Sequence, residues 1–132
     1  MRVFDVAEAR RYVPFLLDAF GRIRGWLDQA REGAGRLQSE KLTPEEVREL
    51  RGSVDRFIEQ IRVELARLQD AGIEVKGADG LVDFPAMIEG RHVYLCWKYP
   101  EQSIDFWHEL DAGYAGRQPI VDDAAFDRSW LS

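Results

Sequence analysis

Apolar residues recur at alternating spacings of three and four along residues 9–30, and this pattern constrains the fold more than any other feature of the chain. Side chains at such intervals share one face of an α-helix. The residues are Ala9, Val13, Leu16, Phe20, Ile23, Leu27 and Ala30. Asp5 and Glu8 form a capping-box pattern that predicts the start of the helix. Pro14 predicts either a kink or a separate first turn, because its ring clashes with the preceding turn of a helix.

A second helical stripe of the same kind follows. Thr43, Pro44 and Glu46 supply its N-cap, its first helical position and its capping-box partner, and Gly72 is predicted to end it in the left-handed conformation. The apolar positions are Val47, Leu50, Val54, Phe57, Ile58, Ile61, Leu65 and Leu68. Residues 32–42 contain two glycines and no sustained period, so they are predicted to connect the helices. Two helices of roughly 35 to 40 Å joined in this way predict an antiparallel hairpin.

The second half of the chain changes to a period of two, which is typical of strands. Residues 81–88 and 91–98 flank Glu89-Gly90, a two-residue connection that predicts a hairpin with Ile88 opposite Arg91. In that register an apolar face should lie against the helices, and its pairs are Val82 with Trp97, Phe84 with Leu95, and Ala86 with Val93. The other face is mixed and carries Leu81, Asp83, Pro85 and Met87 across from Lys98, Cys96, Tyr94 and His92.

Pro85 and residues 104–110 each constrain the predicted sheet. Pro85 has no N–H to donate to a ladder, so the first strand should be an edge strand or carry a bulge there. Residues 104–110 continue the alternation and predict a third antiparallel strand. Its residues Ile104, Phe106, His108 and Leu110 would then face the helices, while Asp105, Trp107 and Glu109 would join the mixed face. A short helix capped by Ser103 is the alternative.

These segments together predict an α+β fold, in which a long antiparallel helical hairpin packs on a small antiparallel β-meander of about three strands. The whole chain, residues 1–132, is expected to form one domain. Within it, the helical hairpin would span residues 5–71, the meander and loop 73–120, and a tail 121–132. The tail should dock on the protein or on a second subunit through Phe126, Trp130 and Leu131.

Reactive side chains concentrate in residues 91–119, although they match no catalytic motif. The candidates for acid–base catalysis are His108, Glu109 and Asp111. The candidate metal ligands are His108, His92, Asp83 and Glu109, which offer nitrogen and oxygen donors for a divalent metal. The candidate ligand-binding residues are Arg117, Trp97, Trp107 and Tyr114, of which Arg117 can bind carboxylate or phosphate and the tryptophans can form walls.

Each of these residues also has a structural interpretation. His108 would be buried in its neutral form with one hydrogen bond. Arg117 would bridge to Glu109 or Asp111 and so pin its loop to the sheet. Cys96 would pack as a small apolar group.

The net charge of −6 lies in the C-terminal part, where residues 73–132 carry 5 basic and 11 acidic side chains. An acidic surface repels phosphate backbones, so nucleic-acid binding is not expected, and cations or basic partners are favoured. No apolar run approaches the length of a membrane span, and the first residues lack the apolar region of a signal peptide. A single cysteine fits a reducing compartment, so a cytoplasmic location is expected, and it excludes zinc sites that need two cysteines.

Four stretches carry a resemblance to a known family: FDVAEARRYVPFL, GLVDFPA, VYLCWKY and IDFWHELDAGYAGRQPI. They resemble the prokaryotic domain of unknown function family 2203, and the resemblance spans nearly the whole chain. It implies a bacterial, cytoplasmic setting and a domain boundary. It implies no activity and no catalytic residue.

Two hypotheses for function follow from the residues. The hairpin is longer than a small sheet can cover, so part of its apolar stripe should stay exposed and pair with a second copy. This predicts a non-enzymatic, self-associating adaptor, a homodimer through the hairpins with a protein partner on the sheet face or tail. The alternative is a protein that binds a divalent metal or a small ligand, with hydrolysis as one option, at a site formed by residues 104–117.

Overall fold

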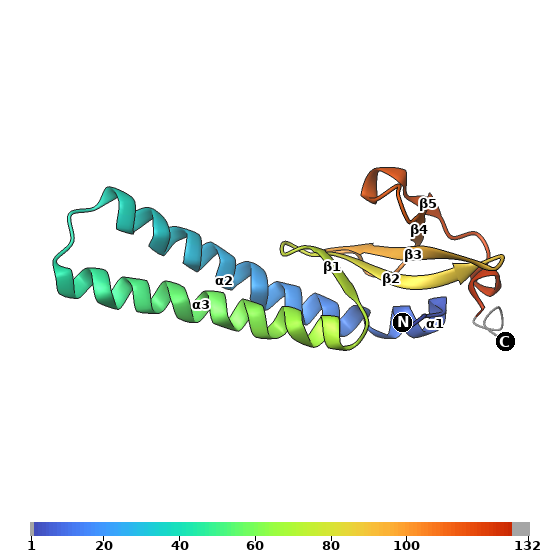
Figure 1. Cartoon of the computed structure of the whole chain (residues 1–132), viewed down its shortest axis with the longest axis horizontal. Helices are drawn as coiled ribbons and strands as arrows, with labels where there is room; N and C mark the ends of the chain where they lie inside the picture. The colour runs from blue at the N-terminus through green and yellow to red at the C-terminus, as the bar shows by residue number, and fades with distance from the viewer. Residues whose placement is uncertain (1, 128–132) are drawn as a thin grey trace.

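The computed structural model describes residues 2–127, which form a long helical hairpin with a sheet on one end of it (Figure 1). The helices are α1 (Val6–Arg11), α2 (Val13–Ser39) and α3 (Pro44–Asp70). The strands are β1 (Glu74–Gly77), β2 (Leu81–Ile88), β3 (Arg91–Lys98), β4 (Phe106–Glu109) and β5 (Gln118–Pro119), and two short 3-10 helices are η1 (Tyr114–Gly116) and η2 (Asp123–Phe126). The predicted α+β fold, a hairpin packed on an antiparallel sheet, is confirmed.

The first helical segment begins and breaks where the sequence indicates. Asp5 and Glu8 form a complete capping box at the start of α1. Tyr12 then interrupts the helix, and α2 begins at Val13 with Pro14 in its first turn. A proline in the first turn costs little, because the N–H that it lacks would have no partner inside the helix anyway. The prediction of a separate first turn is therefore confirmed.

The predicted connection over residues 32–42 is too long, because α2 continues to Ser39. Gly33 lies inside the helix as a close-packing position. A Cβ atom placed there would come within 2.6 Å of the Val54 Cγ2 atom and 3.4 Å of the Leu50 Cδ1 atom of α3. Glycine is required here by the approach of the neighbouring helix, and the pattern of residues alone cannot distinguish this role from that of a helix breaker.

Both ends of α3 follow the sequence signals. Thr43 and Glu46 complete its capping box. At the other end, Gly72 has a φ of 88° and its N–H donates to the Gln69 carbonyl, while the Ile73 N–H donates to the Leu68 carbonyl. This pair of bonds is the Schellman motif, which satisfies carbonyl groups that the helix end leaves open.

The sheet has five strands in the order β1-β2-β3-β4-β5, two more than the predicted meander. The register of β2 against β3 is as predicted, with Ile88 opposite Arg91 and Asp83 opposite Cys96. Strand β1 pairs with β2 only as far as Asp83, so β2 is an edge strand at Pro85. The Pro85 carbonyl accepts from the Phe4 N–H on that edge, and the N–H that proline lacks would point the same way.

Residues 106–109 form a strand, as predicted, but its two faces are reversed. Strand β4 pairs with β3 so that His108 lies opposite Tyr94 and Trp107 lies opposite Leu95. Consequently His108 and Phe106 join the mixed face, and Trp107 and Glu109 join the helix side. Side chains alternate along a strand, so a shift of one residue in the pairing moves every side chain to the other face. Leu110 lies beyond the strand and is exposed.

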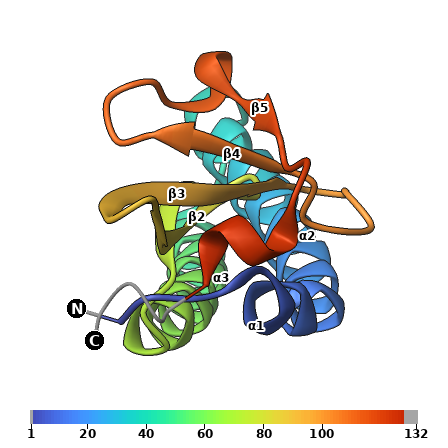
Figure 2. The same cartoon turned by 90° about the vertical axis from the view of Figure 1, so that its right-hand side faces the viewer.

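The apolar face of β2 and β3 packs on the helices, as predicted. Figure 2 shows the sheet as a layer above α1, α2 and α3, with η2 below the sheet. Phe84, Leu95 and Trp97 are fully buried in one cluster with Leu16 and Phe20. Phe126 of the tail also docks here, against Trp107. The predicted docking of Trp130 and Leu131 lies outside the described residues.

The hairpin runs well past the end of the sheet (Figure 1). Ile58 of α3 lies in this stretch with 52% of its surface exposed. Other apolar positions of the same helix, such as Val47, Leu50 and Val54, are only half-buried. This part of the hairpin is therefore a two-helix structure without a covering layer among residues 2–127.

The role of Gly33 gives a test of the packing. Gly33→Ala should lower the free energy of unfolding by about 1 to 2 kcal/mol, because the clash with Val54 exceeds the gain in helix propensity. Gly35→Ala is the matched control, since a Cβ atom there meets nothing within 4 Å. That variant should be more stable by about 1 kcal/mol. Urea unfolding of both variants measures the difference, and equal effects would refute the close-packing role of Gly33.

Candidate functional site

Asp83, Cys96 and His108 come together on the face of the sheet that points away from the helices. Asp83 and Cys96 are directly opposite each other on β2 and β3, and His108 projects from β4 on the other side of β3. Their side chains meet above the central strand. Among residues 2–127 none of the three α-helices covers this face, yet the three residues are only 3%, 0% and 2% exposed. The site is thus a buried polar cluster on the outer side of the sheet.

The hydrogen bonds of His108 define where a proton must lie. Its Nδ1 atom is 2.7 Å from the carbonyl oxygen of Glu109, which can only accept, so Nδ1 carries a hydrogen. Its Nε2 atom is 3.0 Å from Asp83 Oδ1. A neutral imidazole with its proton on Nδ1 has a lone pair at Nε2, and two lone pairs would repel. A second proton is therefore held between Nε2 and Oδ1, on one atom or the other.

Cys96 is a protonated thiol in this environment. Burial raises the pKa of the Cys96 thiol to about 12, the negative charge of Asp83 adds to this increase, and the Arg117 guanidinium opposes it. A thiol of this kind is a poor nucleophile at neutral pH, because the thiolate is the reactive form. Deprotonation of Cys96 would require a new positive charge beside the sulfur.

Arg117 and Glu101 lie beside the cluster. The Nη2 atom of Arg117 is 2.8 Å from both carboxylate oxygens of Glu101, and the guanidinium carbon lies 4.1 Å from the centre of the Phe106 ring. Phe106 is the direct neighbour of Cys96 on β4. The predicted bridge from Arg117 to Glu109 or Asp111 is therefore wrong; Glu109 bonds to Arg91 at 2.8 Å.

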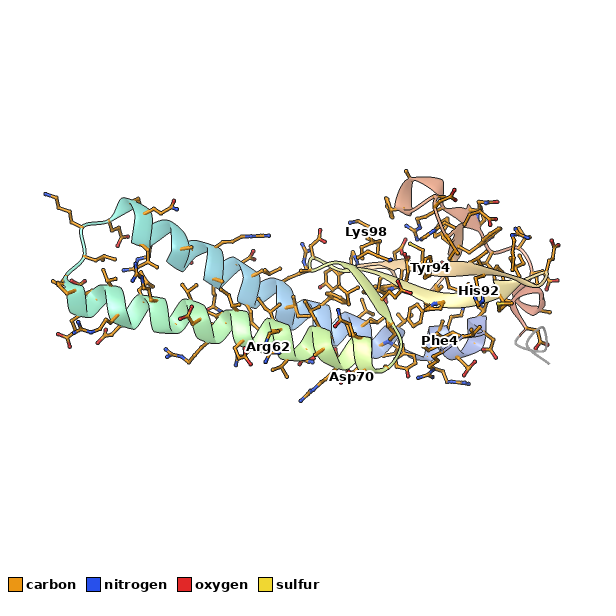
Figure 3. The ribbon with its side chains drawn as sticks, viewed as in Figure 1. Phe4, Arg62, Asp70, His92, Tyr94 and Lys98 are labelled. Carbon is orange, nitrogen blue, oxygen red and sulfur yellow. The ribbon has the colours of Figure 1, made fainter. Side chains whose placement is uncertain are left out.

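The side of the sheet that carries the cluster is visible in Figure 3, where Tyr94 and Lys98 are labelled on the side away from the helices and Phe4 on the helix side. The Tyr94 ring lies 5.5 Å from the His108 ring. Its hydroxyl donates to the Glu74 carboxylate of β1 at 3.0 Å. Tyr94 thus flanks the cluster and links it to the edge strand.

A model of one protein family matches residues 2–120, and its description is an uncharacterized conserved protein, DUF2203. The chain belongs to the DUF2203 family. Neither the comparison with curated proteins nor the comparison with solved structures returns a match for this DUF2203 chain. Within residues 2–127, none of its helices is both long enough and apolar enough to cross a membrane.

The candidate residues of this DUF2203 protein divide into two groups. Asp83 and His108 are in the cluster, and Arg117 lies near it with Tyr114 against its guanidinium. The others lie elsewhere. Trp97 and Trp107 are on the helix side of the sheet, so they cannot form walls of the site. Glu109 is on that side too and pairs with Arg91, while Asp111 is exposed in the turn after β4. His92 shares the face of Asp83 but is exposed at its end, opposite Met87.

Cys96 is the member of the cluster that was expected to be only a packing residue. Its position opposite Asp83 follows from the hairpin register, so the signal was present in the sequence. The sequence did not show that the His108 side chain lies on the same face of the sheet as Asp83 and Cys96. Once His108 is placed on the mixed face, one ligand atom of each residue lies within 4.8 Å of the others. Sulfur, nitrogen and oxygen donors at such separations suit a transition metal such as Zn²⁺.

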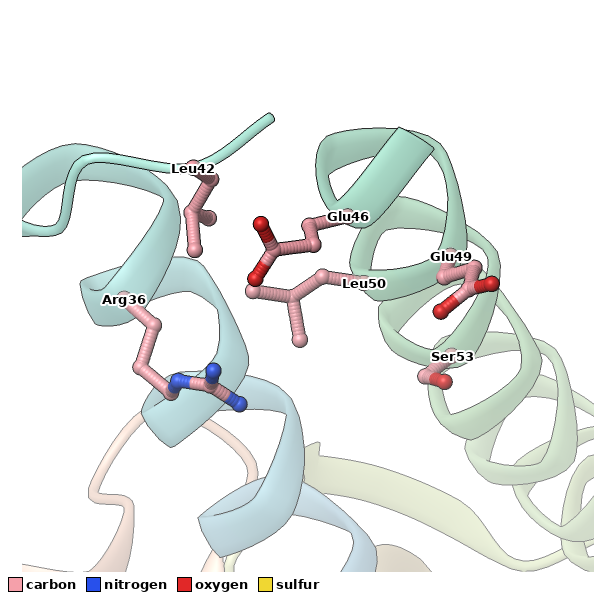
Figure 4. A pocket seen from close by; sticks show the side chains of 6 residues that line it. All are labelled: Arg36, Leu42, Glu46, Glu49, Leu50 and Ser53. Atoms are coloured by element: carbon pink, nitrogen blue, oxygen red, sulfur yellow. The ribbon is translucent and has the colours of Figure 1, made fainter. Parts of the chain in front are cut away.

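A cavity of about 250 Å³ lies at the far end of the hairpin and is lined by Arg36, Leu42, Glu46, Glu49, Leu50 and Ser53. In Figure 4, Glu46 and Leu50 of α3 point into the space between the helices, toward Arg36 of α2. The charged groups there have structural roles, since Glu46 caps α3 and Arg36 bonds to Glu40 at 3.2 Å. We therefore place the candidate site in the cluster on the sheet.

Proposed function

We propose that this protein binds one transition-metal ion, best Zn²⁺, through Asp83 Oδ1, Cys96 Sγ and His108 Nε2. The observation that carries the proposal is the gathering of these three donors within 4.8 Å of one another at a buried position. Buried ionisable groups are costly, so three of them in one place require a compensating charge or a shared network. A divalent cation would supply that charge.

The orientation of His108 supports the proposal. Metal-binding histidines donate their second ring N–H to a carbonyl or carboxylate, which fixes the ring and leaves the other nitrogen as the ligand. The Nδ1–H of His108 is fixed in this way on the Glu109 carbonyl, and Nε2 points at Asp83. In the metal-bound form the ion would replace the proton between Nε2 and Oδ1, and it would also deprotonate Cys96.

The ligand set indicates what such a centre can do. Structural zinc sites in proteins have four protein ligands, whereas catalytic sites have three and keep one position for water or substrate. The cluster offers three. A zinc-bound water at the fourth position would be acidic enough to attack an ester or amide near neutral pH, which is the basis for proposing a hydrolytic role. We propose the cytoplasm as its location, because the thiolate ligand needs a reducing compartment.

The metal proposal is tested by elemental analysis of untagged protein, purified without chelator and then loaded with Zn²⁺ and dialysed. We expect about one zinc per chain. Cys96→Ser, His108→Gln and Asp83→Asn should each weaken zinc binding by more than about 100-fold. Loss of a residue that only hydrogen-bonds to a metal ligand already weakens binding by about 10- to 100-fold, and loss of the ligand itself should cost more. Thermal unfolding of each variant shows whether it still folds.

The controls are the two candidate ligands that lie outside the cluster. His92→Gln and Glu109→Gln should bind zinc like the parent protein, because His92 is exposed at the end of the face and Glu109 is on the helix side. A parent protein that holds no zinc after loading would refute the proposal. Equal zinc binding by the parent protein and Cys96→Ser would show that the Cys96 thiolate is not a ligand.

Self-association through the hairpin remains a second proposal, for a non-enzymatic adaptor. The observation that favours it is the uncovered stretch of α2 and α3 with Ile58 exposed over 52% of its surface. An isolated pair of helices buries little apolar surface, and a second hairpin would complete a four-helix arrangement. The two proposals are compatible, because the cluster lies on the sheet, which is at the other end of the molecule from the uncovered stretch (Figure 1).

Ile58→Asp tests self-association, because a charge at this exposed position of α3 should dissociate a dimer without affecting the fold. Sedimentation equilibrium should give a dimer for the parent and a monomer for the variant. Val121→Asp is the control, since Val121 is 93% exposed outside the hairpin, and this variant should stay dimeric. A parent protein that is monomeric at every concentration tested would refute the proposal.

A further inference from the structure

Arg117 has a hydrogen-bond donor that residues 2–127 leave unused. Its side chain is 10% exposed, and its Nε atom is buried with no hydrogen-bond partner in that part of the chain. Burial of an N–H of a charged group without a partner is unfavourable, so such a group calls for an acceptor atom from a ligand, a water molecule or an anion. The position of the guanidinium decides which of these fits.

The guanidinium is held rigidly. Phe106 and Tyr114 lie on it, with ring centres 4.1 and 4.8 Å from its central carbon. Glu101 accepts from Nη2 with both oxygens, and its Oε1 also accepts the Lys98 backbone N–H at 2.7 Å. Glu101 is therefore fixed by β3 and occupies one edge of the guanidinium. The Nε atom lies outside this contact, and Glu101 does not bond to it.

The fixed guanidinium lies next to the proposed metal ligands. The Phe106 ring, which lies 4.1 Å from the central carbon of the guanidinium, belongs to the residue paired with Cys96 across β3 and β4. A planar guanidinium with a free N–H is suited to the oxygens of carboxylates and phosphates. The boundary with solvent is close, since the Glu101 side chain is 29% exposed and Tyr114 is 46% exposed.

We propose that the metal centre takes a small oxyanion, a carboxylate or a phosphate group, with one oxygen on the metal and another on Arg117 Nε. The inference rests on the proposed metal site, whose three protein ligands leave a fourth position. It names the class of substrate or product for that position. Arg117 acts here as a binding residue, and Glu101 positions it.

The test uses protein loaded with Co²⁺, which takes zinc sites and gives visible absorption bands that respond to each change of ligand. Acetate and phosphate are titrated separately into the loaded protein, and chloride is the control. We expect a saturable change of the bands with one of the two oxyanions, and the tighter one identifies a carboxylate or a phosphate as the group recognised. Chloride at the same ionic strength should give no such change.

Variants of Arg117 assign the effect. Arg117→Lys keeps a positive charge opposite Glu101 but has no Nε donor, and Arg117→Met removes the charge as well. Each should weaken oxyanion binding by about 10- to 100-fold, the equivalent of one hydrogen bond to a charged group, while Co²⁺ still binds. Arg91→Met is the control, because Arg91 pairs with Glu109 away from the cluster, and it should bind the oxyanion like the parent.

The outcomes separate the two proposals. A cobalt centre that forms but responds to neither oxyanion overturns the inference and leaves the metal proposal intact. An equal response in the parent and Arg117→Lys also overturns it, and the lysine variant decides the matter if Arg117→Met fails to fold. A parent protein that forms no cobalt centre overturns both proposals together.

Discussion

One buried contact, the hydrogen bond between His108 and Asp83, joins strand β4 to strand β2 across the strand that separates them. At 3.0 Å and with both side chains almost fully buried, it fixes the register of β4 and the face on which His108 lies. A polar pair of this kind is costly unless each partner satisfies the other. The sheet therefore buries residues on both faces. Its apolar face packs against the helices, and its other face carries a small buried polar cluster of Asp83, Cys96 and His108. The metal and oxyanion proposals both depend on this second face.

The register of β2 and β3 could be predicted because the two-residue turn at Glu89-Gly90 leaves little freedom, and it correctly placed Asp83 opposite Cys96. The faces of β4 could not be predicted in the same way. The segment between Lys98 and Phe106 is long and irregular, so it carries no information on register, and the apolar Ile104 suggested the wrong phase. Hydrophobic alternation also misleads where polar residues are buried. It placed His108 on the helix side, whereas His108 is buried on the mixed face against Asp83. A shift of one residue in the phase of β4 thus decided whether the sequence placed His108 beside Asp83 and Cys96.

Other differences have equally local causes. Gly33 was interpreted as part of a connection because glycine is rare within helices, whereas the approach of Val54 makes it the residue that fits. Strands β1 and β5 have only 4 and 2 residues, too few for a periodic signal. The helix boundaries at Asp5, Thr43 and Gly72 were predictable, because capping depends on a few adjacent residues. Features that depend on adjacent residues, such as helix caps, could be predicted from the sequence. Features that depend on contacts between distant segments, such as the register of β4, could not.

In the proposed metal-bound form, the ion takes the place of two protons in the cluster, and counting the released protons tests this exchange. Apart from the proton on Nδ1, which stays, the metal-free cluster holds one proton between His108 and Asp83 and one on the Cys96 thiol, whose pKa of about 12 keeps it protonated at neutral pH. Titration of Zn²⁺ in weakly buffered solution at pH 7, followed by a pH-stat, should therefore release about two protons per zinc bound. Release of one proton or none on binding would contradict the account.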